Sequence, residues 1–374
     1  MTEYKDRGVL VAMSGGVDSS IAAYLLKKAG CSCMGTTMRL YNNEDVGLSP
    51  GHTCCSLRDI DDAAAVAARL GIPYTVLDFT MDFREQVIDK FIRVYEAGGT
   101  PNPCIDCNRW LKFDRLIEFA FGKGLDCVAT GHYARIEKDE KNGRYLLKKA
   151  CDESKDQSYV LYMLSQQQLA HIIFPLGDMT KTQTRALARQ LGFVNADKHD
   201  SQDICFVPDG DYVKFMERET GKHYPEGDFL DLDGHVVGTH AGAVRYTIGQ
   251  RKGLGLAMGR PVYVCAKSME DNTVTVGPEE ALRSRRLMAE DFNWISISGP
   301  DESDPDWSIT VTARTRYHQK EQAARAYMDP DGPGRVIVEF DQPQRAVTPG
   351  QAVVLYDGDL VVGGGTILKT LPEE

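Results

Sequence analysis

The fold is decided near the start of the chain by residues 8–20, which read Gly-Val-Leu-Val-Ala-Met-Ser-Gly-Gly-Val-Asp-Ser-Ser. Residues 8–13 form a short apolar run, typical of a strand buried on both faces of a parallel sheet. From Val17 the apolar residues recur at helical spacing, and the pattern ends before Gly30, which suits the residue after a helix. A buried strand, a glycine turn and a helix together predict the first unit of a parallel sheet with crossover helices.

The same alternation of strand and helix continues to about residue 208. The further elements predicted there are strands at 33–40, 73–77 and 126–130 and helices at 59–70 and 82–97. We therefore assign residues 1–208 to one N-terminal domain of the α/β class, built on a parallel sheet.

The sequence pattern changes at about residue 209, beyond which few segments have the apolar periodicity of a helix. Glycine, proline and aspartate separate short β-type runs, as in a small antiparallel barrel. The clearest of these runs are 308–314, 335–340 and 352–356. We predict a small central domain over 209–283 and a C-terminal antiparallel β-barrel over 284–374.

Composition bounds the class of protein. The chain has 374 residues, 42% of them hydrophobic, and a formal charge of −11, which fits two or three folded domains. It does not fit a disordered chain or a generally basic RNA-coating protein. No run approaches the roughly 18 apolar residues that a membrane span needs. With ten cysteines and no secretion signal, we expect a cytoplasmic protein that has no membrane partner.

Charge is uneven along the chain. Residues 100–190 hold 14 bases against 11 acids, whereas residues 191–240 hold 4 against 11. Residues 241–326 are close to neutral, with 12 bases and 11 acids, and residues 327–374 hold 3 against 8. An RNA partner would therefore be held by local basic strips, and its binding would depend only shallowly on salt concentration.

The turn between the first strand and the first helix predicts a phosphate-binding loop. Glycines at positions 15 and 16 allow backbone amides to turn inward, and the start of a helix adds free N–H groups and partial positive charge. The loop differs from a Walker A motif because no Gly-Lys-Ser/Thr follows. An ordinary glycine turn is the alternative, but the full string after a buried strand favours phosphate binding.

Two cysteine-bearing segments stand out from the buried cysteines that pack as small apolar groups. Residues 100–109 read Thr-Pro-Asn-Pro-Cys-Ile-Asp-Cys-Asn-Arg, in which two prolines stiffen a polar turn around Cys104 and Cys107. Nearby Lys112 is expected to lower a thiol pKa. Cys205 follows the polar run 200–203. A Cys-x-x-Cys pair fits redox chemistry or half of a metal site, and the lack of further ligands at zinc-like spacing counts against structural zinc.

Several motifs occur in an order that resembles a known family. They are residues 14–20, 100–113, 130–134, 155–159, 200–206, 246–255 and 348–351. Together they resemble the bacterial tRNA-specific 2-thiouridylases, the MnmA family of the PP-loop ATP pyrophosphatase superfamily. The resemblance covers essentially the whole chain, and its specificity comes from the combination of motifs.

The resemblance implies an enzyme, a tRNA-uridine 2-sulfurtransferase. Such an enzyme uses ATP and Mg²⁺ to adenylate O2 of the wobble uridine in tRNAs of the Lys, Glu and Gln type. Sulfur from a cysteine persulfide then displaces AMP, and pyrophosphate is the other product. The sulfur would come from a cysteine desulfurase or a sulfur-carrier protein, and we expect a monomer.

The resemblance also assigns roles to residues. It makes Cys107 the nucleophile and Cys205 the residue that carries the persulfide, with a disulfide forming between them during turnover. The expected ATP contacts are Ala12, Met13, Ser14, Gly15, Gly16, Val17, Asp18, Ser19, Met38 and Gly131. The expected tRNA contacts are Asn102, Pro103, His132, Lys155, Asp156, Gln157, Arg316, Tyr317 and Gln351.

One position departs from the family. Cys104 stands where many relatives have the aspartate of an Asn-Pro-Asp triplet close to the target base, so the role of Cys104 in contacting the base stays open. An alternative uses Cys104, Cys107 and Cys205 as three ligands of an iron–sulfur cluster, whose open iron would bind sulfide. The roles of Cys54 and Cys55 stay open.

Other classes fit less well. An amidating enzyme similar to GMP synthetase would need an ammonia source, and no segment reads as a glutaminase. A 4-thiouridine synthetase shares the loop but carries different RNA-binding domains. A non-catalytic RNA-binding scaffold would not need the intact phosphate loop.

Overall fold

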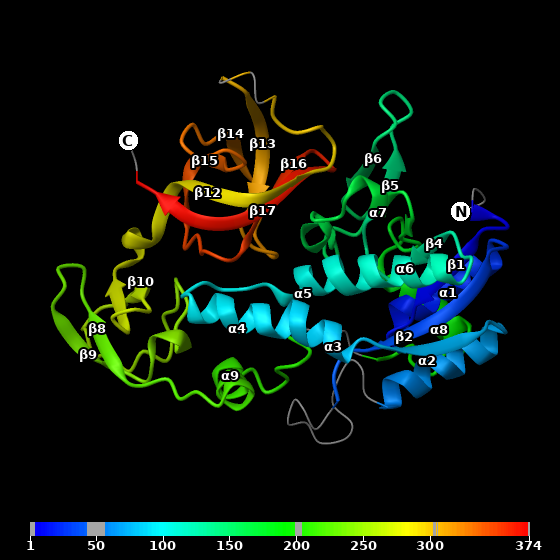
Figure 1. The fold of residues 1–374 in the computed structure, drawn as a ribbon, viewed down its shortest axis with the longest axis horizontal. Coiled ribbons are helices and arrows are strands. Elements are labelled where there is room, and N and C mark those ends of the chain that lie inside the picture. Colours follow the sequence, from blue (N-terminus) through cyan, green and yellow to red (C-terminus); the bar gives the residue numbers. More distant parts are fainter. Residues whose placement is uncertain (1–3, 43–56, 199–203, 302–303, 305, 373–374) are drawn as a thin grey trace. The chain divides into compact units, whose positions relative to one another are not determined.

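The computed structural model describes residues 4–42, 57–198, 204–301, 304 and 306–372. The chain forms two compact units (Figure 1). The first unit comprises residues 1–88, 103–210 and 359–361, and the second comprises 89–102, 211–358 and 362–374. Within the described residues, no helix has the length and apolar character required to cross a membrane.

The first unit is built on a parallel sheet, as predicted, with strand order β3-β2-β1-β4-β7. The strands are β1 (Gly8–Ala12), β2 (Ser32–Arg39), β3 (Tyr74–Asp78), β4 (Cys127–Ala129) and β7 (Ile172–Ile173). The helices that share its larger core are α1 (Val17–Lys28), α2 (Leu57–Leu70) and α8 (Lys181–Gln190). The central strand β1 is apolar because both of its faces are covered: Val9 and Val11 belong to the core cluster of α1 and α2, and Leu10 to that of α6 (Leu116–Gly122).

The segment with Cys104 and Cys107 is helical rather than a stiff turn. Pro103 opens α5 (Pro103–Asp106), a position where its missing N–H costs nothing. A π-helix, η3 (Cys107–Arg115), follows directly and continues into α6. π-Helical turns are rare and occur frequently at functional sites, so this local geometry singles out the Cys107 segment.

The predicted helix over residues 82–97 is interrupted. The first unit contains α3 (Thr80–Phe83) and the π-helix η2 (Arg84–Ile88), and α4 (Asp89–Glu96) begins the second unit. The remaining elements of the first unit are β5 (Arg135–Lys138), β6 (Tyr145–Lys148), η4 (Ser158–Leu161) and α7 (Gln166–Leu169). The β5–β6 hairpin was not predicted, although Asn142-Gly143 at its turn is a strong hairpin signal.

After α4, the second unit continues with α9 (Tyr212–Thr220) and a four-stranded sheet of strand order β10-β11-β8-β9. Its strands are β8 (Gly227–Leu230), β9 (Val236–His240), β10 (Tyr263–Ser268) and β11 (Thr273–Gly277). Two short 3-10 helices, η5 (Ala243–Arg245) and η6 (Glu279–Leu282), lie in its connections.

The C-terminal part of the second unit is an antiparallel barrel, as predicted. Its strands are β12 (Arg283–Trp294), β13 (Ser308–Arg314), β14 (Gln322–Met328), β15 (Val336–Arg345), β16 (Ala352–Asp357) and β17 (Leu360–Leu371). They pair in the order β12-β15-β14-β13-β16-β17, and a β12–β17 pairing closes the ring. Alternate residues such as Leu287, Val338 and Val353 fill the interior, which leaves their neighbours on the outer face.

Candidate functional site

The phosphate loop joins β1 to α1, and hydrogen bonds made by its own side chains fix its conformation. Ser19 Oγ accepts a hydrogen bond from the Ser14 amide (3.1 Å) and donates one to the Gly16 carbonyl (3.1 Å). Helix α1 has no side-chain hydrogen bond at its N-cap. The first-turn amides of an uncapped helix form a ready site for a phosphate group.

Glycine is required at two places around this loop. Gly15 has φ +71°, and a Cβ there would lie 2.4 Å from the Asp59 carbonyl oxygen. At Gly131, which follows β4, a Cβ would lie 2.6 Å from the Ser19 nitrogen. Both predicted ATP contacts are therefore places where backbone approaches backbone, and neither tolerates a side chain.

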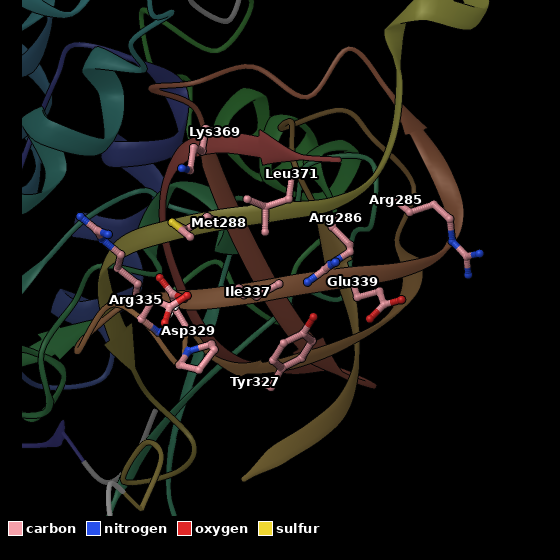
Figure 2. Close-up of a pocket in the computed structure, with 12 residues that line it drawn as sticks. Arg285, Arg286, Met288, Tyr327, Asp329, Arg335, Ile337, Glu339, Lys369 and Leu371 are labelled. Atoms are coloured by element: carbon pink, nitrogen blue, oxygen red, sulfur yellow. Dashed lines mark hydrogen bonds between the residues drawn. The ribbon is translucent and has the colours of Figure 1, made fainter. Parts of the chain in front are cut away.

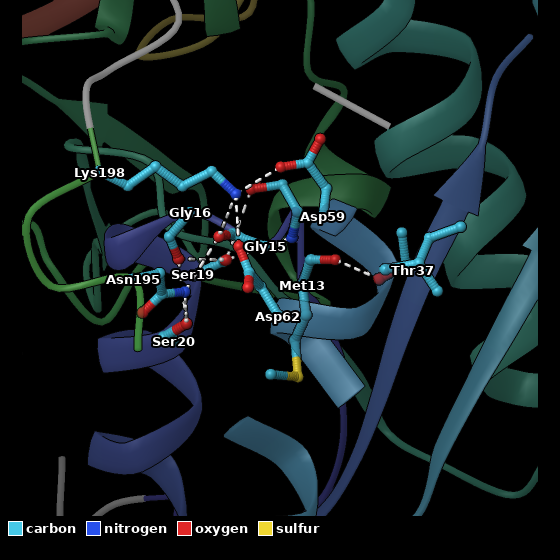
Figure 3. A network of polar contacts seen from close by, with 12 residues as sticks. Met13, Gly15, Gly16, Ser19, Ser20, Thr37, Asp59, Asp62, Asn195 and Lys198 are labelled. Atoms are coloured by element: carbon cyan, nitrogen blue, oxygen red, sulfur yellow. Dashed lines mark hydrogen bonds and ion pairs between the residues drawn. The ribbon is translucent and has the colours of Figure 1, made fainter. Parts of the chain in front are cut away.

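A polar network fixes the back of the loop (Figure 3). Lys198 Nζ donates to the Gly15 carbonyl (3.1 Å), to Asp62 (2.8 Å) and to Asp59. Asn195 Nδ2 donates to the same carbonyl (3.0 Å) and to Ser20 Oγ (2.9 Å). Burial lowers the pKa of Lys198, but its bonds to the two carboxylates outweigh burial and the net shift is upward. Two donors thus hold the Gly15 carbonyl.

Asp18 is already paired. Its carboxylate accepts hydrogen bonds from Lys181 Nζ at 2.6 and 2.8 Å and from the Tyr133 hydroxyl at 2.9 Å. Lys181 opens α8 and is only 8% exposed. Sequence reasoning missed Lys181 because a single lysine at the start of a helix carries no motif. Its ammonium group lies in contact with a residue of the phosphate loop, where it can interact with a bound anion.

The other predicted ATP contacts lie at the carboxyl end of the sheet, where ligands bind in open α/β folds. Met13 is buried, and its amide donates to the Thr36 carbonyl (2.7 Å). Ala12 and Met38, at the ends of β1 and β2, pack partly buried in the same apolar cluster. Val17 is buried in the main core at the start of α1. Ala12 and Met38 offer an apolar surface next to the polar loop.

Cys107 lies at the first position of η3 and is 8% exposed. Burial raises the pKa of its thiol to about 11, although Lys112 acts in the opposite direction. Lys112 therefore lowers the pKa of this thiol, as expected, but the net shift is upward because desolvation of the thiolate costs more than Lys112 recovers. Cys104, three residues earlier on α5, is exposed.

Cys205 is half-buried and its backbone is anchored. The Tyr41 hydroxyl donates to the Cys205 carbonyl (2.8 Å), and the adjacent Phe206 packs edge-on against Phe83, with 5.6 Å between ring centroids. The predicted motif residues 200–203 lie outside the described residues, as do Cys54 and Cys55. Neither Cys205 nor Cys107 is in a disulfide.

The three thiols considered as cluster ligands are not gathered. In the described ranges, the one group of three or more His, Cys, Asp or Glu side chains with ligand atoms within 4.8 Å of one another is Asp231, Asp233 and His235. That group lies at the turn between β8 and β9, where His235 and Asp233 amides bond to Asp231.

His132 is a buried, uncharged imidazole. Its ring packs against Phe113 and Phe174, at centroid distances of 5.7 and 5.8 Å, and its Nδ1 is 2.7 Å from Thr130 Oγ1. Burial and, secondarily, Lys112 lower its pKa well below the usual value for histidine. A neutral imidazole here can exchange hydrogen bonds with a base without adding charge.

The segment 155–157 is shaped by its central residue. Asp156 is buried and accepts hydrogen bonds from the amides of Ala150 and Ser158 (both 3.2 Å) and from the Ser158 hydroxyl (2.9 Å). Gln157 Oε1 accepts from the Tyr133 amide (2.9 Å), which connects this turn to the residue after His132. Lys155 is half-buried beside them.

The second unit brings several predicted tRNA contacts together. Arg316, Tyr317 and Gln351 line one pocket of about 490 Å³, with Thr100. Gln351 Nε2 donates to the Thr100 carbonyl (2.9 Å), close in sequence to the half-buried Asn102. His318 and Gln319 line the same pocket and were missed by sequence reasoning, although they directly follow a predicted contact. Pro103 belongs to the first unit, where it opens α5.

Three family models match the chain. Residues 7–209 match the tRNA methyl transferase HUP domain, 213–278 the tRNA methyl transferase PRC-barrel domain, and 284–367 the aminomethyltransferase β-barrel domain. Among solved structures, a 4-thiouridine synthetase–RNA complex with bound ATP is 17% identical, with a TM-score of 0.31 over 56% of this chain and 50% of that chain. A structural similarity this low does not support any inference about this chain.

Curated relatives match over nearly their whole length. The chain is 50% identical to the tRNA-specific 2-thiouridylase MnmA of Acetivibrio thermocellus, over 96% of this chain and 98% of that protein. It is 51% identical to the protein of that name from Moorella thermoacetica, over 96% and 98%, and 47% identical to that from Clostridioides difficile, over 98% and 100%. The chain therefore belongs to the MnmA family of tRNA-specific 2-thiouridylases.

Proposed function

We propose that this chain uses ATP to replace O2 of the wobble uridine of tRNA with sulfur, releasing AMP and pyrophosphate. The observation that carries the proposal is the occurrence, in one unit, of a phosphate loop with an uncapped helix start and of the two thiols expected from the family, Cys107 and Cys205. An activated uridine oxygen and a sulfur nucleophile are what this exchange requires.

The phosphate loop would bind the triphosphate of ATP. The amides at the start of α1 would receive phosphate oxygens, and Lys181 would stabilise the charge that develops when the α–β phosphate bond breaks. Mg²⁺ is the ion expected to accompany the phosphates. Because Asp18 is paired with Lys181, we propose that Asp18 positions this lysine. Ala12 and Met38 would pack against the adenine ring.

The sulfur transfer balances with two cysteines. The terminal sulfur of a Cys205 persulfide attacks C2 of the adenylated uridine, and the C2–O bond breaks to release AMP. The Cys107 thiolate then attacks Sγ of Cys205, which leaves sulfur on C2 and a disulfide between the cysteines. The two electrons that reduce the transferred sulfur come from the two thiols, and an external thiol reductant restores them.

The persulfide route is favoured over the iron–sulfur alternative by the arrangement of Cys104, Cys107 and Cys205. Cys104 is exposed and Cys107 is buried, and the three sulfurs do not form a metal-holding group among the described residues. Iron and acid-labile sulfide assays on anaerobically purified protein test this choice. Activity that requires stoichiometric iron would favour the cluster.

The proposed tRNA contacts fall in both units. Pro103, His132, Lys155, Asp156 and Gln157 belong to the first unit. Asn102, Arg316, Tyr317 and Gln351 belong to the second, where the pocket that three of them line offers a guanidinium, a phenol and an amide. Bases of a single-stranded loop can stack on such aromatic groups and bond to such polar ones.

We propose a cysteine desulfurase or a sulfur-carrier protein as the sulfur source, a monomeric enzyme, and the cytoplasm as its location. None of the eight cysteines in the described ranges is in a disulfide, which supports a reducing compartment. The domain boundaries at residues 208 and 283 also remain a proposal.

Mass spectrometry of the tRNA nucleosides tests the function. Purified chain, wobble-uridine tRNA, ATP, a thiol reductant and a persulfide-generating source should yield 2-thiouridine, and Cys205→Ser should abolish it. Cys151→Ser is the matched control, since Cys151 is an exposed cysteine of the same unit with no proposed role. A methylated uridine, as the family-model descriptions would suggest, or full activity of Cys205→Ser would contradict the proposal.

A further inference from the structure

Tyr133 connects two parts of the first unit to which different substrates are assigned. It follows β4 and comes directly after His132, and its side chain is 2% exposed in the main core cluster of the unit. Its three polar groups, the hydroxyl, the amide and the carbonyl, all form hydrogen bonds with other segments of the chain. The identity of these partners links the residue to both proposed substrates.

The hydroxyl group of Tyr133 fixes the carboxylate of Asp18 in the phosphate loop. Its oxygen lies 2.9 Å from Asp18 Oδ1 and 3.0 Å from Oγ1 of Thr184, a residue of α8. A phenol has one proton and a carboxylate can only accept, so the proton is donated to Asp18 in a charge-assisted bond. The same Oδ1 also accepts a hydrogen bond from Lys181 Nζ at 2.8 Å. Tyr133 and Lys181 therefore share one oxygen of Asp18.

The backbone of the same segment packs against the start of α1. At Gly131, shortly before Tyr133, a Cβ would lie 2.6 Å from the Ser19 nitrogen and 2.8 Å from the Asp18 carbonyl carbon. The segment therefore meets the phosphate loop twice, through its backbone at Gly131 and through the hydroxyl group of Tyr133. Because packing this close leaves no free space, a displacement of the segment would also displace the loop.

The main chain of Tyr133 is bonded to Gln157, a proposed tRNA contact. The Tyr133 amide donates to Gln157 Oε1, and the Gln157 amide donates to the Tyr133 carbonyl, both at 2.9 Å. Both polar groups of the Tyr133 backbone are thus committed to one residue. His132, which immediately precedes Tyr133, is another proposed tRNA contact. A ligand bound to His132 and Gln157 would therefore restrain Tyr133 from both of its neighbours.

We propose that Tyr133 couples tRNA binding to ATP binding, as a positioning residue for the pair formed by Asp18 and Lys181. The inference rests on the proposed function, because it needs tRNA at His132 and Gln157 and ATP at the phosphate loop. Bound tRNA would restrict the motion of Tyr133 and, through its hydroxyl group, that of Asp18. A nucleotide would then bind to a loop that is already held in place, which produces cooperativity between two sites without a change of fold. Such coupling favours ATP binding when the uridine to be adenylated is present.

The ratio of two dissociation constants tests this coupling. The Kd of a non-hydrolysable ATP analogue is measured without tRNA and with a saturating concentration of wobble-uridine tRNA. In the wild-type chain, tRNA should lower this Kd about tenfold, which is within the usual range for coupling between two sites. Tyr133→Phe removes only the hydroxyl group and keeps the buried ring, so the ratio should fall to about one. The affinity for tRNA, measured with and without the analogue, must change by the same factors, because coupling is reciprocal.

Substitutions of Gln157 test the connection from the tRNA side. Gln157→Leu removes the acceptor of the Tyr133 amide, so the ratio should again fall. Gln157→Glu keeps an acceptor oxygen at that position and should retain most of the wild-type ratio. Because tRNA is present at saturation, a weaker direct contact between residue 157 and tRNA does not enter the ratio.

Two other tyrosines are matched controls for the loss of a hydroxyl group. Tyr24 is half-buried on α1 of the same unit, and Tyr327 is half-buried on β14, where it lines a hollow of about 770 Å³ on the barrel (Figure 2). In the part of the chain that the structure describes, neither hydroxyl group has a hydrogen-bond partner. Tyr24→Phe and Tyr327→Phe should therefore keep the wild-type ratio.

The outcomes separate the coupling from the proposed function. A wild-type chain that makes no 2-thiouridine in the assay with the persulfide-generating source contradicts the proposed function itself. An active wild-type chain whose Kd for the nucleotide does not respond to tRNA overturns the coupling alone. The coupling is also overturned if Tyr133→Phe and Gln157→Leu keep the wild-type ratio, even when they bind the nucleotide more weakly, because a purely structural bond would weaken both affinities equally.

Discussion

The phosphate loop and the reactive cysteines belong to the same unit but differ in how far the fold prepares them. Around the loop, Ser19, Asn195 and Lys198 already occupy hydrogen-bonding positions, and Asp18 already holds Lys181. Cys107, by contrast, is buried as a neutral thiol, which is the unreactive form. The phosphate loop and its partners, the ATP half of the site, are therefore preorganised, whereas Cys107, in the sulfur half formed with Cys205, is not ionised for reaction.

This difference fits the order of the proposed chemistry. Adenylation needs fixed groups around a charged triphosphate, and preorganised donors stabilise developing charge at no reorganisation cost. A persulfide and a thiolate are reactive toward water-borne oxidants, so keeping Cys107 protonated until substrate arrives protects it. We expect binding of tRNA and ATP to activate the sulfur half.

The largest effect should follow removal of the Lys181 ammonium group. Lys181→Met leaves the Asp18 carboxylate without its cation, with the Tyr133 hydroxyl still donating to it, and removes a positive charge from the loop. The tRNA-dependent formation of AMP should therefore fall about a hundred- to a thousandfold. Lys181→Arg keeps the charge and should recover part of the rate. Release of AMP at the wild-type rate by Lys181→Met would show that the preorganised pair is not part of the ATP half.

The second effect concerns the ionisation of Cys107. A thiol pKa of about 11 in place of 9.0 leaves about a hundredfold less thiolate at neutral pH, so alkylation of Cys107 by iodoacetamide should be slower by that factor than for an unperturbed cysteine. Because the thiolate is the reactive form, the rate should rise about tenfold per pH unit up to that value.

Peptide mass spectrometry, which follows each cysteine separately, provides the measurement, and exposed Cys104 is the internal control. Addition of tRNA and a non-hydrolysable ATP analogue should accelerate labelling of Cys107 if substrates activate the sulfur half. A plateau near neutral pH in the free protein would mean that Cys107 is already a thiolate, and the contrast between the two halves would fail.

The smallest effect on activity is expected from substitution of Lys198, which donates a hydrogen bond to the Gly15 carbonyl of the phosphate loop. Lys198→Met removes one of two donors to the Gly15 carbonyl and leaves Asp59 and Asp62 without their cation. We expect the KM for ATP to rise about tenfold with a smaller change in kcat, since one hydrogen bond to a charged group contributes about 1.5–3 kcal/mol. Lys198→Arg should restore most of the affinity, and a change in kcat alone would contradict a positioning role.

The parallel sheet and the phosphate loop could be predicted because their signals are local. Residues 8–13 are apolar because β1 is buried on both faces, and the loop follows directly in sequence. The closed barrel was predictable for the same reason, since its β-type runs are separated by glycine- and proline-containing turns.

Lys181 and Lys198 could not be predicted, because they reach the loop from 163 and 183 residues away and only the tertiary fold brings them there. The pKa of Cys107 was misjudged for a related reason. The sequence shows the nearby Lys112, but it does not show that η3 buries the thiol, and burial decides the sign of the shift. Contacts between distant segments and desolvation are properties of packing, which local pattern does not contain.

The most direct test of the central claim follows the fate of the uridine oxygen. tRNA carrying a heavy-oxygen label at O2 of the wobble uridine is incubated with the chain, ATP and a sulfur source, and the AMP is analysed by mass spectrometry. If the phosphate loop adenylates O2 and sulfur then displaces it, the AMP will carry the heavy oxygen, in an amount equal to the 2-thiouridine formed. Unlabelled AMP, or 2-thiouridine formed without AMP, would contradict the account.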